Sequence, residues 1–182
     1  MLNVEKLKKY RKQADQTVSD LARAGLRASW DSNQSASAIR NWEKGLLKPQ
    51  PTMSDVDSLA KALGVARQDL LVWNATHKFA PIAPRKARLV ADLIRGRYAQ
   101  EALDVLDFAN KRAAVLFKKV LESAIANADE QEADVSRLFV SDARVDEGGI
   151  RQGTRRWRPK DRGRAVSWTR LASHLRIAVD TE

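Results

Sequence analysis

The chain has 182 residues, of which 43% are hydrophobic, and it carries a formal net charge of +10 with two His and no Cys. The lack of Cys excludes disulfides and thiolate zinc sites, and two His cannot build a metal centre alone, so we expect neither a metal nor a cofactor. The N-terminus lacks the apolar region of a signal peptide, and no later run approaches a membrane span, which favours a cytoplasmic protein without a membrane partner.

The positive charge is concentrated towards the two ends of the chain. Residues 1–73 contain 12 basic and 8 acidic residues, residues 74–149 contain 12 of each, and residues 150–182 contain 9 and 3. We expect two domains, divided between residues 73 and 74. A basic excess of this kind favours a polyanionic partner, because neutralised phosphates release their counterions.

Residues 2–73 predict an all-α bundle of short helices separated by turn signals. Thr17 is placed to cap the second helix, and Ser35 to cap a third helix that carries Ile39 and Trp42 on one side and ends at Gly45. A fourth apolar stripe and a last short helix beginning at Asp69-Leu70-Leu71 follow.

This region resembles the helix-turn-helix domains of the lambda-repressor and Cro type. The string Ile39-Arg40-Asn41-Trp42-Glu43-Lys44-Gly45 carries the resemblance, together with Pro49 and LAKALGV at 59–65. In that family the helix holding Ile39 enters the major groove of DNA. The resemblance implies that the DNA-facing residues are Ser35, Ser37, Arg40 and Asn41.

Two features oppose DNA reading. The connection GLRASWDSN at 25–33 is about seven residues longer than the tight turn of such domains, and Ala36 and Ala38 offer no hydrogen bond to a base edge. The alternative interpretation is a docking module in which Ile39, Trp42 and Leu59 form the core.

The second domain begins with an extended segment, 76–83, and a helix from Pro84 that ends at Gly96 with an apolar stripe of Leu89, Val90, Leu93 and Ile94. Cations crowd the first turn of this helix, where each costs about 0.3–1 kcal/mol against the helix dipole. A bound phosphate would remove this cost, and the alternative is a solvated basic turn.

Two more helices follow, at 99–108 and after a predicted cap at Asn110, the latter with a core stripe from Ala113 to Ala128. Alternation then predicts two antiparallel strands, one with Val135, Phe139, Ala143 and Val145 and one with Leu175, Ile177 and Val179. The expected fold class is α+β: a small antiparallel sheet covered by three helices, with a long protruding basic β-hairpin at about 148–174.

The hairpin carries eight Lys and Arg residues between Ile150 and Arg170, against one acid, Asp161. Its apolar content is too small for an isolated hairpin to be stable in water, so it requires a partner. Pro159 and Gly163 predict a tip at 157–163, around which the cations splay. Trp157 and Trp168 either stack on bases or pack across the hairpin strands.

Residues 74–182 resemble the bacterial large-subunit ribosomal protein twenty-two family. The matching strings are APRKARLVADLIRGR at 83–97, NKRAA at 110–114, SAIANA at 123–128, VDEG at 145–148 and the spaced basic run from Arg155 to His174. The resemblance implies a structural, ribosome-bound protein that contacts large-subunit ribosomal RNA and neighbouring ribosomal proteins and assists assembly. It further implies that the hairpin reaches the wall of the polypeptide exit tunnel, near the nascent peptide and the macrolide-binding region.

The residues expected to contact RNA are Lys and Arg side chains from these strings and from the hairpin, together with His174. They are Arg85, Lys86, Arg88, Lys111, Arg112, Arg151, Arg155, Arg156, Arg158, Lys160, Arg162, Arg164, Arg170 and His174. Two departures from the family are Ala83, where a capping serine is usual, and an outgoing hairpin arm about three residues longer, which extends the tip or bulges at Gly149 or Gly153.

The sequence leaves three functions to consider: a ribosomal RNA-binding constituent, a DNA-binding regulator or dual-function protein, and a nucleic-acid-processing enzyme. The enzyme is disfavoured because no paired carboxylates, metal ligands or activated nucleophile occur in the basic regions, and His174 beside Ser173 has no positioned carboxylate. We therefore expect a non-enzyme and favour the ribosomal constituent.

Overall fold

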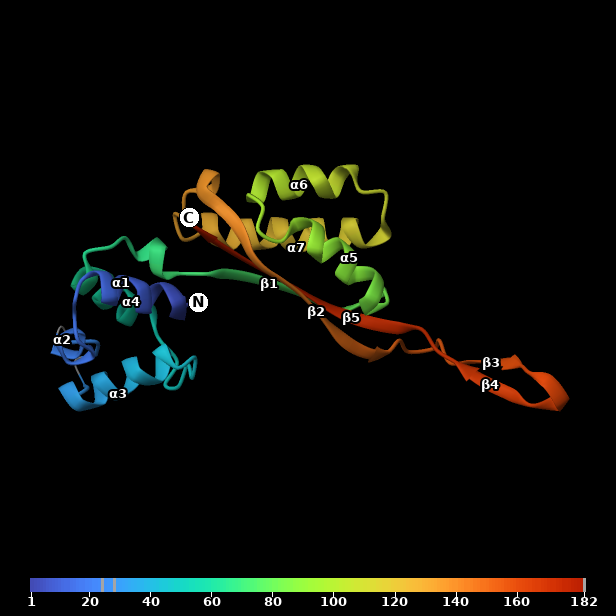
Figure 1. Ribbon diagram of the computed structural model, residues 1–182, viewed down its shortest axis with the longest axis horizontal. Coiled ribbons are helices and arrows are strands. Elements are labelled where there is room, and N and C mark those ends of the chain that lie inside the picture. The colour runs from blue at the N-terminus through green and yellow to red at the C-terminus, as the bar shows by residue number, and fades with distance from the viewer. Residues whose placement is uncertain (24, 28, 182) are drawn as a thin grey trace. The chain divides into compact units, whose positions relative to one another are not determined.

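The computed structural model describes residues 1–23, 25–27 and 29–181. The chain divides into two compact units, Met1–Val72 and Trp73–Glu182. The first unit contains the helices α1 (Val4–Gln13), α2 (Val18–Arg23), α3 (Ser32–Glu43) and α4 (Met53–Leu63) and the 3-10 turn η1 (Arg67–Leu70) (Figure 1).

The core of the first unit is formed by one or two large apolar side chains from each helix. These are Leu7 of α1, Leu21 of α2, Ile39 and Trp42 of α3, and Val56 and Leu59 of α4. The indole Nε1 of Trp42 donates a 2.6 Å hydrogen bond to the carbonyl of Pro49, which satisfies its polar atom and fixes the loop after α3. Ile39, Trp42 and Leu59 are thus core residues.

The start of α3 differs from the sequence prediction. The helix begins at Ser32, three residues before the predicted cap, because Asp31 and Gln34 form a capping box in which the Asp31 amide donates to Gln34 Oε1 at 3.3 Å. Ser35 is an interior residue of the helix and is buried. Leu71 also differs, since it pairs with Leu2 in an isolated antiparallel bridge instead of entering a helix.

The second unit is an α+β domain. Its strands are β1 (Trp73–Ala80), β2 (Leu138–Ile150), β3 (Arg156–Pro159), β4 (Ala165–Trp168) and β5 (Leu171–Thr181). Its helices are α5 (Pro84–Ile94), α6 (Ala99–Phe108) and α7 (Arg112–Asp129), and its 3-10 turns are η2 (Val135–Arg137) and η3 (Asp161–Gly163). The expected fold class is confirmed, and Trp73, assigned by sequence to the first domain, is the first residue of β1.

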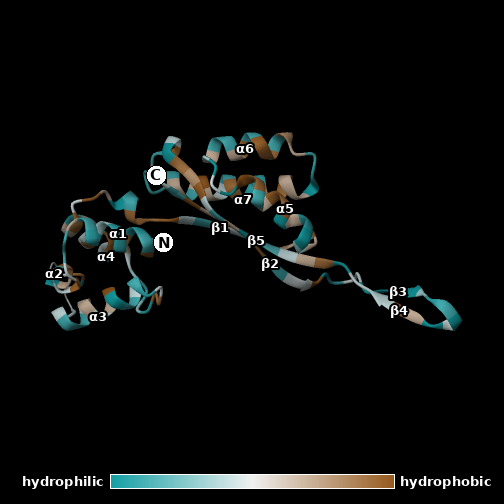
Figure 2. Ribbon diagram, viewed as in Figure 1, coloured by the Kyte–Doolittle hydropathy of each residue, from teal (hydrophilic) through white to brown (hydrophobic). Residues whose placement is uncertain are grey.

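The three-stranded sheet has the antiparallel order β1-β5-β2, so the last strand of the chain is its centre. Leu175 and Ile177 of β5 are fully buried, as are Phe117 and Leu121 of α7. Figure 1 shows the helices on one side of the sheet and the β3–β4 ribbon projecting beyond it, and Figure 2 shows that most of this ribbon is hydrophilic. The long stripe of α7 therefore forms the core with the sheet.

A β-bulge in β2 overturns the predicted alternation at its start. Val140 pairs with Val179 and Asp142 with Ala178, so Ser141 is an extra residue on β2. The bulge reverses the parity, and Leu138 and Val140 before it face the core together with Ala143 and Val145 after it. Phe139 and Val135, predicted to face the core, are not among the buried residues.

Two helix predictions in this unit also need correction. On α5 the buried stripe is Ala87, Val90, Ala91 and Ile94, whereas Leu89 is 57% and Leu93 is 39% exposed. The small side chains of Ala87 and Ala91 allow α5 to approach the sheet closely, so the helix packs on it through a single row of residues. Leu89 and Leu93 lie outside this contact. The cap of α7 is Lys111, one residue after the predicted Asn110.

Candidate nucleic-acid interface

The projecting ribbon has two distinct faces that are fixed by its register. Arg156 pairs with Trp168 and Arg158 with Val166, while Trp157 pairs with Ser167. Paired residues of an antiparallel ribbon point to the same side, and neighbours along a strand point to opposite sides. Trp157 and Trp168 therefore lie on opposite faces and do not pack on each other, whereas Trp168 packs across the ribbon against Arg158 of the other strand.

The longer outgoing arm is absorbed at the base of the ribbon. Arg151 donates its amide to the carbonyl of Arg170 at 2.9 Å, and Arg156 pairs with Trp168, so residues 152–155 oppose Thr169 alone. A turn accommodates the three additional residues, with Thr154 Oγ1 donating to the Arg151 carbonyl at 2.6 Å. The extra length therefore does not extend the tip.

Two glycines allow the backbone conformation where the ribbon leaves the sheet. Gly149, with φ 77°, lies in a bulge of β2 opposite β5, and Gly153, with φ 69°, lies in the turn. Positive φ values of this size are inexpensive only for glycine.

The length of the ribbon follows from its return arm. This arm advances seven residues from Leu171 to Arg164, which at about 3.3 Å per residue places the tip about 23 Å from the sheet.

The cations of this segment are exposed and free of acidic partners. The part of the chain from 151 to 170 is fully described, and none of its Lys and Arg side chains forms an ion pair with a carboxylate. Arg162 at the tip has φ 56°, a conformation that turns the chain between β3 and β4. The positive charge is therefore available to an external polyanion.

The two tryptophans differ in their availability for stacking. The ring of Trp168 has the guanidinium of Arg158 at 4.7 Å and that of Arg170 at 5.3 Å from its centroid. Trp157 is 62% exposed and has Arg155 at 5.6 Å. Because its faces are less occupied, Trp157 is the better placed of the two to stack on a base.

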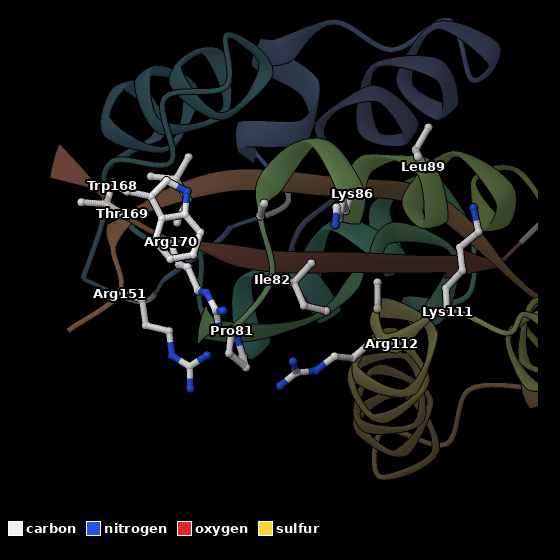
Figure 3. A pocket seen from close by; sticks show the side chains of 13 residues that line it. Pro81, Ile82, Lys86, Leu89, Lys111, Arg112, Arg151, Trp168, Thr169 and Arg170 are labelled. Carbon is white, nitrogen blue, oxygen red and sulfur yellow. The ribbon is translucent and has the colours of Figure 1, made fainter. Parts of the chain in front are cut away.

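Where the ribbon joins the body, an open cavity of about 850 Å³ gathers side chains that are far apart in the sequence (Figure 3). It is lined by Pro81, Ile82, Ala83, Lys86, Leu89, Lys111, Arg112, Ala113, Arg151, Trp168, Thr169, Arg170 and Leu171. The lining includes five cations and no acid. Six of the predicted RNA-contact or stacking residues therefore meet at one place.

The helices α5 and α7 both begin at this cavity. Ala83 and Lys111 are their N-caps, and neither provides a capping side chain. Pro84 occupies the first turn of α5, as predicted. Uncapped N-termini and first-turn cations are each unfavourable alone, and an anion would stabilise both.

Not every predicted contact residue lies at this cavity. Arg85 and Arg88 are exposed on α5 outside it, and Arg88 lies instead in a smaller hollow against β2. His174 is half-buried, and its Nδ1 accepts the Phe79 amide at 3.1 Å while the two rings meet edge to face at 4.7 Å. His174 therefore holds the bulge of β1, where Phe79 has φ 56°.

Ser173 is a positioning residue that the sequence did not reveal as such. Its hydroxyl is buried and donates to the carbonyl of Ile82 at 2.9 Å, which fixes the segment before α5 to the central strand. The serine stands beside His174 in a string that matches the family, but only the fold shows that it reaches across 91 positions to the cavity wall.

Replacing Ser173 by Ala is expected to lower the free energy of unfolding of the second unit by about 1–3 kcal/mol, because the buried Ile82 carbonyl loses its donor. Ser141→Ala is the matched control, since its hydroxyl donates to the Ala178 carbonyl at an exposed position, and it should change stability by less than about 0.5 kcal/mol. Denaturant unfolding of both variants measures the difference. Equal effects would contradict the role of Ser173.

In the first unit, the structure changes the set of residues that α3 offers to a ligand. Ser35 is 1% exposed, so it cannot contact DNA, and Ala36 and Ala38, which sequence counted against DNA reading, are core residues. The exposed positions Ser37 and Arg40 remain. Asn41 is half-buried and donates to the Lys48 carbonyl at 3.4 Å, so it is partly engaged within the unit.

The early start of α3 adds polar side chains that sequence analysis missed. Ser32, Asn33 and Gln34 are exposed in the first turn, the part of a recognition helix that contacts bases in helix-turn-helix domains. The printed bounds of α2 and α3 end at Arg23 and begin at Ser32, and position 28 of the predicted 25–33 segment lies outside the described residues. The Asp31-x-x-Gln34 capping box was the signal that could have placed this turn.

Arg27 and Asp55 form an ion pair within this unit, and the Asp55 side chain is fully buried. Arg27 Nη2 lies 2.7 Å from Asp55 Oδ2, and it also donates to the Gln50 carbonyl at 2.9 Å. Burial by itself raises the pKa of Asp55, but the hydrogen bonds from Arg27 and Thr52 and the Arg27 charge outweigh it, and the resulting pKa is below the ordinary value. Arg27 thus has a structural role.

Within the described residues, no group of three or more His, Asp or Glu side chains is arranged to hold a metal ion. Over the same part of the chain, no helix is long and apolar enough to cross a membrane.

Comparison with known proteins gives a separate match for each unit. Residues 75–180 match the family described as ribosomal protein L22p/L17e, and residues 6–76 match the Cro/C1-type HTH DNA-binding domain. The large ribosomal subunit protein uL22 of Sorangium cellulosum (strain So ce56) is 48% identical over 110 residues, which cover 60% of this chain and 97% of that relative. Both resemblances noted in the sequence are confirmed.

Proposed function

Because the chain belongs to the ribosomal protein L22p/L17e family, whose members are structural and not enzymes, we propose that its second unit binds large-subunit ribosomal RNA and assists assembly. The observation that carries this proposal is the set of eight Lys and Arg residues between Ile150 and Arg170, exposed and without acidic partners. Arg provides planar donors suited to phosphate and to stacking on unpaired bases.

The test is co-sedimentation of the full-length protein with large-subunit particles. We expect the protein in the large-subunit fraction at low salt and a progressive release as salt rises, because phosphate neutralisation dominates the affinity. A protein found only in the soluble pool under all salt conditions would contradict the proposal.

We further propose that the hairpin tip lies at the wall of the polypeptide exit tunnel, where the nascent peptide and macrolides would pass close to it. The narrow two-stranded ribbon and its reach of about 23 Å support this placement. A ribbon without a hydrophobic face of its own is stable only when surrounded by a partner along its length, and RNA on both sides would supply that.

A second candidate function belongs to the first unit. We propose that α3 binds duplex DNA, because its outward residues are polar along the helix and the alanines that opposed this function are in the core. Neighbouring positions Ser32, Asn33, Ser37 and Arg40 offer donors and acceptors to base edges and phosphates. The alternative remains a docking module that contacts a protein or ribosomal RNA.

Selection of bound fragments from a random duplex DNA library with the full-length protein tests this function. We expect an enriched sequence whose affinity falls about 5- to 150-fold in Arg40→Ala, the effect of losing about 1–3 kcal/mol at one base or phosphate contact. Ser35→Ala, on the buried face of the same helix, is the control and should bind as the wild type does. If no sequence is enriched, the docking interpretation is correct.

A further inference from the structure

The cavity where the ribbon joins the body combines a cationic surface with an apolar one. Binding of duplex RNA through its phosphates would require only the cationic surface. Five cations line the cavity together with the apolar side chains of Pro81, Ile82, Leu89 and Leu171, which form its apolar wall. The apolar wall indicates that part of the ligand is a flat or apolar group.

We propose that this cavity holds a single unpaired nucleotide of the large-subunit RNA, turned out of its stack. The proposal rests on the RNA binding proposed above and specifies which RNA element occupies this site. Bases become accessible to an apolar wall only in loops, bulges and ends, because paired bases are stacked within the helix. The volume of about 850 Å³ is in the range of pockets that enclose one small molecule and is too small for a duplex.

The two halves of a nucleotide match the two surfaces of the cavity. The phosphate fits between Lys86 on α5 and Arg112 on α7, where two positively charged helix ends meet without capping side chains. The base fits against Leu89 and Leu171, which are 57% and 41% exposed and gain most from being covered. Trp168 borders the cavity but already contacts Arg158 and Arg170.

The lining also predicts weak discrimination among the four bases. Apart from the five cations, the lining offers two neutral polar groups, the hydroxyl of Thr169 and the indole N–H of Trp168. Strong selection of a base requires several hydrogen bonds to its edge, and a wall of aliphatic side chains does not supply them. The site therefore selects an unpaired nucleotide by its position and shape more than by its identity.

Chemical probing of large-subunit RNA reconstituted with the full-length protein tests the proposal. Base-specific reagents report accessibility of unpaired bases, and hydroxyl radicals report accessibility of the backbone. We expect the wild type to lower the reactivity of one unpaired base at least about 5-fold, beside a protected backbone segment; this corresponds to about 1 kcal/mol, a small part of the energy of burying an apolar group.

Leu89→Ser and Leu171→Ser are the test variants, because they alter the apolar wall and leave all five cations in place. We expect both to lose the protection of the base and to keep that of the backbone. Leu93→Ser is the matched control, since Leu93 is exposed on the same helix but does not line the cavity. Leu89 is on an exposed helical surface, so its variant decides the question if Leu171→Ser disturbs β5.

Three results would contradict the proposed nucleotide site or the proposed RNA binding, and each identifies which of the two fails. Base protection that persists in Leu89→Ser would show that the cavity does not cover the base. A protected backbone without any protected base in the wild type would show that the cavity contacts phosphates only. No footprint of either kind would instead contradict RNA binding itself, and with it the proposed function.

Discussion

Replacing Arg155, Arg156 and Arg158 together by Ala is expected to lower the affinity for large-subunit RNA about 100-fold at moderate salt. All three side chains are exposed and lack acidic partners, so each is free to contact a phosphate. A charged hydrogen bond of this kind contributes about 1 kcal/mol or more, and three of them account for a factor of this size. The dependence of log affinity on log salt should become shallower by about 2–3.

The matched control keeps the charges and changes only their shape. Arg→Lys at the same three positions should leave the salt dependence almost unchanged and weaken binding less than the alanines do, because Lys neutralises a phosphate but lacks the planar fork. Filter binding or sedimentation across a salt series measures both variants. An alanine variant with the wild-type salt dependence would show that this part of the ribbon does not contact RNA phosphates.

Replacing Asp55 by Asn is expected to destabilise the first unit by about 3 kcal/mol. The change removes the charge that pairs with Arg27 and weakens the bonds from Thr52 that begin α4. Breaking a buried pair on one side costs about 3–5 kcal/mol, and the partial exposure of Arg27 places this pair at the lower end. Hydrogen exchange of the α4 amides in the full-length protein, with α7 as an internal reference, measures the loss.

Asp57→Asn is the control on the same helix. Asp57 lies 3.5 Å from Arg67 in an exposed pair, and such pairs contribute about 0–1 kcal/mol. Equal effects of the two substitutions would contradict the structural importance of the Arg27–Asp55 pair.

The Asp55 pair also predicts the sign of a pH effect. Because the folded-state pKa of Asp55 is lowered, its contribution to stability is present above the unfolded-state pKa of about 3.9 and is lost as pH falls through the lower folded-state value. The difference in α4 protection between wild type and Asp55→Asn should therefore be constant from about pH 5 to pH 8 and shrink below about pH 4. Hydrogen exchange across this range, corrected for intrinsic rates, tests it.

The sequence predicted well those features that depend on a long regular pattern. The apolar stripe of α7 and the alternation of Leu175, Ile177 and Val179 in β5 both identify buried faces correctly. The turn residues Pro159 and Gly163 also indicated a tip, but the predicted range 157–163 begins too early, because Trp157 and Arg158 are paired in β3 and the turn follows Pro159. In each case several residues repeat the same signal, so one irregular position does not change the predicted element.

The features missed depend on one residue or on contacts between distant segments. The bulge at Ser141 reverses the parity of β2 without any local marker, and the exposure of Leu89 depends on how closely α5 approaches the sheet. The cavity joins segments near Lys86, Arg112 and Arg170, which only the topology brings together. Its cations were predicted individually, but its apolar wall was not.

The most direct test of the account is a map of the large ribosomal subunit assembled with the full-length chain. It should show the β3–β4 ribbon enclosed by ribosomal RNA, residues 157–163 at the wall of the exit tunnel, and the cavity between α5, α7 and the ribbon against RNA. A map in which the ribbon is exposed to solvent, or its cations face protein instead of RNA, would contradict the account.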